Sequence, residues 1–418
     1  MSDRFASERS WDHDLSMLKR VFASLLSRVI LAIVLGILCG QFFPEELARV
    51  FTTFNGLFSN FLGFIIPVLI LALVAPAIAD LGRGAGRWLV ITAGIAYVST
   101  IVAGLLAYGT ATALFPTLLG ERSLTTFSDP SDNALSPYFE VSMPAPMEIM
   151  TALLLAFCVG VGITFIKGET LHRGLEELRE IVMKIVVSAI IPLLPVYIFG
   201  AFLGLTMNGE IGTVINTFLR VVVIAFALTI LYLVLQYTLA GAIAGRNPLS
   251  LLRNMLPAYF TALGTSSSAA TIPVTLQSTL KNGVRQDVAD FVIPLCATIH
   301  LAGSTLKIVL FSVAVMMFMG KDIDPGTYIG FILMLGITMV AAPGVPGGAI
   351  MAAIGLLGSS LGFDDTMISI MIATYIAIDS FGTACNVTGD GAIAVMVNKL
   401  YKKNQHDTEE SSSLSPNN

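Results

Sequence analysis

Four polar residues near the C-terminal end of the chain have a spacing that places them on one side of a helix. Asp379, Thr383, Asn386 and Asp390 are separated by four, three and four residues, within a segment of mostly apolar and small residues. A carboxylate inside a membrane helix is costly and is by default a candidate functional group. The alternatives are a structural ion pair with another helix and, for Asn386, a role in helix packing.

Hydroxyl residues interrupt a second apolar segment at Thr265, Ser266, Ser267 and Ser268. Such residues commonly form hydrogen bonds between membrane helices. If the chain instead reverses here, the next half-helix begins at the serines. Its free N–H groups and positive dipole end then form an anion site that suits a carboxylate.

Glycines and a proline interrupt a third segment over residues 344–348. The glycines, including Gly348, permit close backbone approach, and Pro346 ends one half-helix. This tip is expected to cover the same site from outside.

Two basic residues lie at membrane depth in the segment before that tip. His300 and Lys307 are seven residues apart and can share a helix face. For His300 the alternative is a packing role, and for Lys307 it is snorkelling to the membrane surface. A position about halfway along the span makes snorkelling harder, so both residues are candidates for a role in transport.

The composition shows what must position these residues. Hydrophobic residues make up 55% of the 418 and charged residues only 12%, roughly half the usual charged share. A membrane span needs about 20 apolar residues, and such runs recur from Val29 almost to Leu400. A soluble globular protein is therefore excluded, and no basic, aromatic-studded patch suggests a nucleic-acid partner. The four cysteines show no metal-type or disulfide-type spacing.

The apolar runs predict an all-α integral membrane protein in which one unit occurs twice near the C-terminus. An interrupted stretch precedes a span in both copies, and interrupted segments in corresponding positions indicate a transport site. The alternative is that glycine and proline simply kink two ordinary spans. The predicted spans are 22–43, 52–80, 88–116, 146–166, 182–207, 213–242, 288–319 and 366–399, with interrupted stretches at 252–283 and 327–361. We therefore expect eight transmembrane helices and two re-entrant helical hairpins, arranged as inverted repeats.

The basic residues predict the orientation. Of the 23 Lys and Arg residues, all but Arg49, Arg122, Arg220, Lys307 and Lys321 fall on the side of the N-terminus. Both termini are therefore expected in the cytoplasm of a multi-pass protein. The first 28 residues show no cleavable signal peptide, and the polar tail is expected to be disordered.

Three motifs in this order resemble the dicarboxylate/amino acid:cation symporter family, which includes the glutamate transporters. They are the serine-rich tip followed by residues 271–275, the Gly-Val-Pro-Gly tip at 344–347, and Asn-Val-Thr-Gly-Asp at 386–390. The similarity covers roughly residues 20–402. It implies the glutamate-transporter-homologue fold, a homotrimer and an elevator mechanism. The implied parts are a cytoplasmic segment 1–20, a mainly scaffold part 21–250 whose spans 3 and 6 move with the transport part, a core transport part 251–402 and a tail 403–418.

The resemblance also assigns roles to individual residues. Ser267 and Asn386 match positions that bind a substrate carboxylate, and Asp379 matches the position that binds its amino group. Asp390, with backbone near Cys296 and Asn386, matches a sodium site, backbone near Thr298 matches another, and Val345 matches the outer gate. The predicted substrate-binding set is Thr265, Ser266, Ser267, Val345, Gly348, Asp379, Gly382, Thr383 and Asn386. The predicted coupling-ion set is Ser99, Thr100, Cys296, Thr298, His300, Lys307, Asn386 and Asp390.

Two departures from the family pattern modify the expected cargo. Gly382 stands where members that carry acidic substrates have an arginine, so a neutral or small polar L-amino acid is favoured over a dicarboxylate or acidic amino acid. In the seventh span, His300 and Ala302 replace an amide and a carboxylate that help to hold sodium. Ser99 and Thr100 still offer hydroxyls there. Fixed cations at His300 or Lys307 could take an ion's electrostatic place, so proton coupling stays open beside sodium, the default.

The predicted function is cation-coupled symport of a small solute across a bacterial-type plasma membrane, among membrane lipids and without a cofactor other than the co-transported ion. An intramembrane hydrolase built on Ser267 and His300 is the rival from another class, but nothing supplies its orienting and oxyanion groups. A passive channel and a pure receptor are the other rivals. A receptor leaves both membrane carboxylates unexplained.

Overall fold

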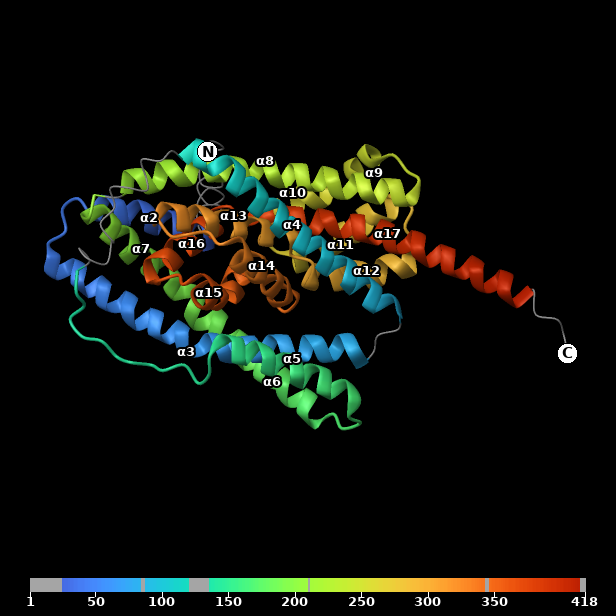
Figure 1. The fold of residues 1–418 in the computed structure, drawn as a ribbon, viewed down its shortest axis with the longest axis horizontal. Helices are drawn as coiled ribbons and strands as arrows, with labels where there is room; N and C mark the ends of the chain where they lie inside the picture. Colours follow the sequence, from blue (N-terminus) through green and yellow to red (C-terminus); the bar gives the residue numbers. More distant parts are fainter. Residues whose placement is uncertain (1–24, 84–86, 120–134, 210, 343–345, 414–418) are drawn as a thin grey trace, which may run out of the picture.

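The computed structural model describes residues 25–83, 87–119, 135–209, 211–342 and 346–413, and within these ranges all regular secondary structure is helical (Figure 1). The first part of the chain forms α2 (Leu25–Cys39), α3 (Glu45–Arg83), α4 (Arg87–Leu119), α5 (Ile149–Phe165), α6 (Thr170–Ile185), α7 (Ile191–Met207) and α8 (Ile211–Ala244). A π-helical turn, Val186–Ile190, joins α6 to α7 just before Pro192. Proline has no backbone N–H to donate, and the wider turn accommodates the missing hydrogen bond.

Each of the two interrupted stretches forms helices that pack against each other. The first contains α9 (Pro248–Asn254), α10 (Leu256–Thr265) and α11 (Ser268–Lys281). The second contains α14 (Pro325–Val340) and α15 (Gly348–Leu361). The α10 helix packs against α11, and α14 packs against α15, so each stretch returns along itself.

Both spans predicted after residue 287 are present, and each contains an interruption of its helix that the sequence does not predict. The seventh consists of α12 (Gln286–Ile299) and α13 (Ala302–Phe318), separated at residues 300 and 301. The last consists of α16 (Asp365–Ala377) and α17 (Asp379–Ser413), bent by 62° at Ile378. Neither break has a proline or glycine at its centre. Contacts from other helices hold both breaks, as described below.

Length and composition support a multi-pass membrane protein. Five helical rods are long and apolar enough to cross a bilayer, and the bent α16–α17 pair makes a sixth. The helices α2, α5, α14 and α15 are apolar but shorter. The helix α17 continues to Ser413, whereas the sequence predicts disorder from residue 403. Lys, Gln and Glu in this stretch are good helix formers.

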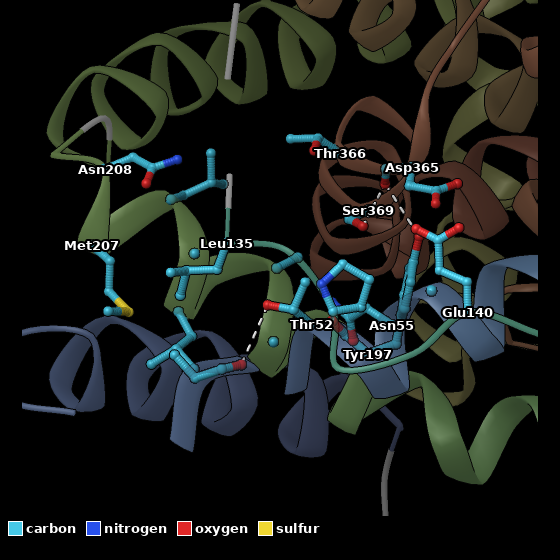
Figure 2. A pocket seen from close by; sticks show the side chains of 18 residues that line it. Thr52, Asn55, Leu135, Glu140, Tyr197, Met207, Asn208, Asp365, Thr366 and Ser369 are labelled. Atoms are coloured by element: carbon cyan, nitrogen blue, oxygen red, sulfur yellow. Dashed lines mark hydrogen bonds between the residues drawn. The ribbon is translucent and has the colours of Figure 1, made fainter. Parts of the chain in front are cut away.

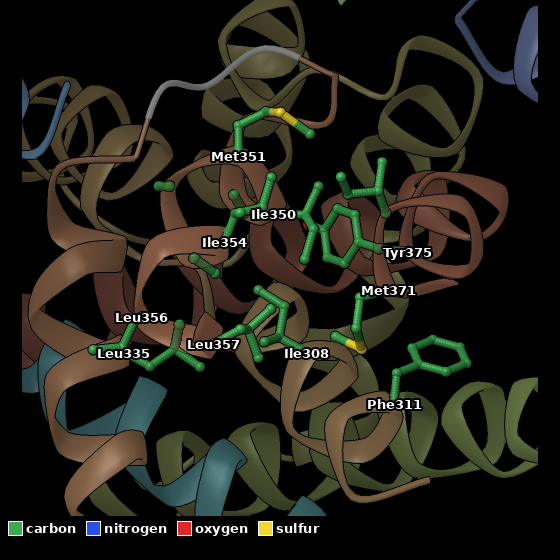
Figure 3. Close-up of a cluster of buried hydrophobic side chains, with 14 of the residues drawn as sticks. Ile308, Phe311, Leu335, Ile350, Met351, Ile354, Leu356, Leu357, Met371 and Tyr375 are labelled. Atoms are coloured by element: carbon green, nitrogen blue, oxygen red, sulfur yellow. The ribbon is translucent and has the colours of Figure 1, made fainter. Parts of the chain in front are cut away.

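The helices form two neighbouring groups. The helices α5, α6 and α7 each pack against α3 along one side, while α17 packs against α8, α10, α11, α12 and α13 on the other (Figure 1). A buried apolar cluster joins α13 to the second hairpin and α16, with Ile308, Phe311, Leu335, Ile350, Met351, Ile354, Leu356, Leu357, Met371 and Tyr375 among its members (Figure 3). Because lipid is as apolar as these side chains, close packing contributes more here than the hydrophobic effect.

Candidate functional site

The first part of the candidate site is the break between α16 and α17. Asp379, the first residue of α17, is only 7% exposed. Its Oδ2 accepts a hydrogen bond of 2.8 Å from the backbone N–H of Gly347, at the tip of the second hairpin. Gly347 has a φ of 75°, a conformation that glycine adopts without strain. The hairpin tip is therefore tied directly to the predicted amine-binding carboxylate.

Lys307 of α13 enters the same break from the opposite side. It is 1% exposed, and its Nζ lies 3.5 Å from Asp379 Oδ1. The ammonium also donates to the backbone carbonyls of Ile378 at 3.1 Å and of Asp379 at 3.3 Å. It lies 4.1 Å from the ring centroid of Tyr375, a cation–π distance. Lys307 does not snorkel to a membrane surface, so the structure excludes that alternative.

The second part is the break between α12 and α13, which Asn386 organises. Its Oδ1 accepts hydrogen bonds from the backbone N–H groups of Gly303 at 2.8 Å and Ser304 at 3.4 Å. Its Nδ2 donates to Ser304 Oγ at 3.1 Å, and Tyr375 donates to the same oxygen at 2.9 Å. Asn386 thus caps the N-terminus of α13, where helices leave N–H groups unpaired. This supports the helix-packing role that the sequence left open, because Oδ1 accepts from both N–H groups.

The third part is a buried polar network around His300. Its Nδ1 lies 2.8 Å from Asp390 Oδ1, and its Nε2 lies 2.9 Å from Ser99 Oγ. Gln236 Nε2 donates to Ser99 Oγ at 2.8 Å, and the Tyr232 hydroxyl donates to the Ser99 carbonyl at 2.6 Å. The network links α4, α8, the seventh span and α17. His300 and Asp390 are each 1% exposed, so this pair is cut off from solvent.

The tip of the first hairpin is more open. Ser266 has a φ of 50° and ends α10, and Ser267 begins α11 by accepting a hydrogen bond from the N–H of Ala270 at 3.3 Å. Thr265 Oγ1 lies 3.2 Å from the hydroxyl of Thr271. Both α10 and α11 pack on α17. The N-terminus of α11 therefore lies at this tip, and α11 packs on the helix that carries the two carboxylates.

The remaining predicted residues have local roles in the structure. The hydroxyls of Thr298 and Thr100 bond to carbonyls in their own helices, and the Cys296 carbonyl accepts from the backbone N–H of His300. Thr383 donates to the Asp379 carbonyl in the same way. Gly348 is the buried first residue of α15, and Val345 lies outside the described residues.

Sequence reasoning missed three members of the site, namely Tyr375, Gln236 and Tyr232. Tyr375 lies four residues before Asp379, a spacing that places two residues on the same face of a continuous helix. This spacing is the signal that could have identified Tyr375. Gln236 is an uncharged amide within an apolar span, a weaker signal than a carboxylate. Its Oε1 has no hydrogen-bond partner among the described residues.

A cavity of about 320 Å³ lies elsewhere, and Figure 2 shows the side chains that line it. It is formed by α3, α7, α16 and the segment that precedes α5, with Asn55, Glu140, Tyr197, Asp365 and Ser369 in its wall. None of the predicted site residues lines it. The carboxylates at 379 and 390 therefore define the candidate site better than this cavity does.

Comparison with known proteins is consistent with this arrangement. A family model described as the sodium:dicarboxylate symporter family matches residues 25–400. A serine/threonine transporter, SstT, of Acinetobacter baumannii (strain AYE) is 26% identical over 396 residues, which cover 91% of this chain and 98% of that protein. The protein of the same name from Acinetobacter baylyi is 24% identical over 394 residues, with the same coverage.

Proposed function

The chain belongs to the sodium:dicarboxylate symporter family, and on this premise we propose that it takes up a small neutral L-amino acid, such as serine or threonine, together with a cation. Membership makes it a multi-pass membrane transporter rather than an enzyme. The substrate proposal extends the names of its relatives, which are serine/threonine transporters.

One observation carries the substrate proposal, namely the contact between Asp379 and the tip of the second hairpin. A buried carboxylate with two oxygens has room for about four hydrogen bonds, so Asp379 can accept from Gly347 and also from a substrate amino group. The N-terminus of α11, at Ser267, suits the substrate carboxylate. Gly382 provides no guanidinium for a second carboxylate, which favours a neutral solute.

The coupling ion is proposed to be sodium, with Asp390, Asn386 and the backbone near Cys296 as its ligands. A specific observation keeps a proton as the second candidate. The imidazole of His300 bonds to both Asp390 and Ser99, where an ion-binding amide would otherwise stand. Histidine is the side chain whose charge ordinarily changes near neutral pH.

The remaining proposals concern architecture. Eight spans with two re-entrant hairpins, both termini in the cytoplasm, a plasma-membrane location, a homotrimer and an elevator movement all follow from family membership. The exposed apolar face of α8, which includes Leu219, Val223 and Leu231, is suited to lipid or to a second copy. The helix α17 packs against both the first hairpin and the seventh span, which supports a movement of these three elements as one part.

Uptake into proteoliposomes tests the proposal. We expect labelled serine or threonine to accumulate under an inward sodium gradient, and unlabelled neutral amino acids to compete with it. Displacement by aspartate or succinate alone would contradict the neutral substrate. Uptake that requires an inward proton gradient and does not depend on sodium would identify the proton as the coupling ion.

A further inference from the structure

Lys307 occupies the space that Gly382 leaves. A Cβ added at Gly382 would collide with Cε and Nζ of Lys307, so the glycine is needed for the lysine to reach this position. The side chain comes from α13 and its ammonium reaches the start of α17. A cation therefore stands beside position 382 although that position itself has no side chain.

The protein surrounds the ammonium with acceptors. Two of its three N–H donors go to the carbonyls of Ile378 and Asp379, and the carboxylate of Asp379 lies at an ion-pair distance of 3.5 Å. These contacts direct the ammonium toward the protein rather than toward a carboxylate of the substrate. Lys307 therefore does not replace the arginine of the acidic-substrate pattern in function, although it replaces it in volume.

The surroundings are those of a bound monovalent cation. At the helix break, the backbone carbonyls of Ile378 and Asp379 both point at Lys307 and accept from its ammonium, in addition to bonds from the Phe381 N–H and the Thr383 hydroxyl, respectively. A carboxylate and the face of Tyr375 complete the shell, and each of these groups stabilises positive charge. The covalent stem of Lys307 holds this cation in place permanently.

We propose that Lys307 is a specificity-determining residue, a tethered counter-ion of Asp379 that reduces by one the number of cations carried with each substrate. The Lys307–Asp379 pair has no net charge, so a zwitterionic amino acid that binds there completes a neutral site. Without Lys307, the same complex would carry one uncompensated negative charge at membrane depth, and a mobile cation would have to balance it. This inference rests on the proposed function, because it concerns the same site.

The experiment replaces the ammonium by an apolar side chain of similar length in the full-length protein. Charge moved per labelled serine is measured in proteoliposomes at clamped membrane potentials for the wild type, K307M and K307R. We expect K307M to move one more elementary charge per serine, with a steeper dependence on sodium, and K307R to behave as the wild type. An unchanged ratio in K307M would overturn the proposal. K321M is the matched control, because Lys321 is exposed and its ammonium donates to the carbonyl of Gly362.

A second measurement needs no transport. Sodium-induced thermal stabilisation is followed in detergent without substrate for the wild type, K307M and the double variant K307M/D379N. We expect sodium to stabilise K307M more than the wild type, because an unpaired carboxylate is then free to bind it, and the double variant to lose this gain. Equal sodium-induced stabilisation of the wild type and K307M would contradict the proposed counter-ion role of Lys307. Failure of wild-type serine uptake would instead contradict only the proposed function.

Discussion

The two interrupted spans contribute two buried pairs, each made of a basic side chain and a carboxylate. The two pairs differ in nearly every other respect. Each pair joins a basic residue of the seventh span to a carboxylate of α17, Lys307 to Asp379 and His300 to Asp390. The first pair is loose, at 3.5 Å, and its carboxylate also binds the tip of the second hairpin. The second is close, at 2.8 Å, and is linked through Ser99 to α4 and α8.

This difference fits two proposed tasks along one helix. A carboxylate that bonds to a hairpin tip is suited to a substrate that enters and leaves. A carboxylate enclosed with histidine among four spans is suited to an ion or proton, whose binding alters a network. Under the proposed function, substrate recognition belongs to the α16–α17 break and coupling to the α12–α13 break, and the following experiments test that division.

The largest effect is expected from Asp379→Asn. The change removes the carboxylate charge and leaves the buried ammonium of Lys307 unpaired, which costs about 3–5 kcal/mol when one partner of a buried pair is lost. Uptake should fall at least about 100-fold, with a lower melting temperature in detergent. The double variant K307M/D379N should regain stability without regaining uptake. Uptake by the single variant at the wild-type rate would show that Asp379 does not bind the substrate.

The next effect is expected from His300→Gln, which addresses the other pair. Glutamine has no pair of ring nitrogens, so it does not keep both the contact with Asp390 and the contact with Ser99. The network should therefore lose about 1–3 kcal/mol of stability through an unsatisfied buried group. The affinity for substrate at saturating sodium should change less than the dependence of uptake on sodium or pH. Initial rates over a grid of sodium and pH values measure this. A change confined to substrate affinity would contradict the division of tasks.

A smaller effect is expected from Gly382→Ala, which crowds the first pair without changing its charge. The added methyl group must displace Lys307, and overpacking of this kind costs about 1–3 kcal/mol. Substrate affinity should weaken and the sodium dependence should persist. Gly94→Ala in α4 is the matched control, because a Cβ there meets no atom within 4 Å. Equal melting temperatures for the two variants would show that position 382 is not crowded.

The smallest effect is expected at Asp324, an exposed carboxylate remote from both pairs. Its Oδ2 accepts from the backbone N–H of Thr327 at 2.7 Å and from the Thr327 hydroxyl at 2.8 Å, and these bonds lower the pKa of the carboxyl. A lowered pKa means that the charged form stabilises the start of α14 at neutral pH, and that this contribution is lost as the pH falls through the folded-state pKa. Asp324→Ala should therefore lower the melting temperature slightly at pH 7, and the difference from the wild type should shrink progressively as the pH is lowered through the acidic range. Uptake at neutral pH should hardly change.

The hairpins could be predicted from the sequence because their reversals are encoded locally. Serines that cap a helix and a glycine with positive φ stand at the two tips themselves. The breaks at His300 and Ile378 carry no such local signal. They are held by Asn386, which caps α13 from α17, and by Lys307, which binds the carbonyls at Ile378 from α13.

The candidate site shows the same limit. The helical spacing of Asp379, Asn386 and Asp390 shows that they matter together, but periodicity within one helix cannot show what faces them. Pairing Asp390 with His300 requires contact between residues 90 positions apart, which is set by tertiary packing. The roles of Lys307 and Tyr375 depend on the bend that places them together.

The shared volume of positions 382 and 307 also predicts a pattern across related sequences. A long side chain can occupy this space from α17 or from α13, but not from both. Relatives should therefore show covariation, with a small residue at one of the two positions whenever the other is long. A designer who wishes to introduce an arginine at 382 should shorten Lys307 in the same step, and the exchange would move the positive charge from one helix to the other while the volume stays filled.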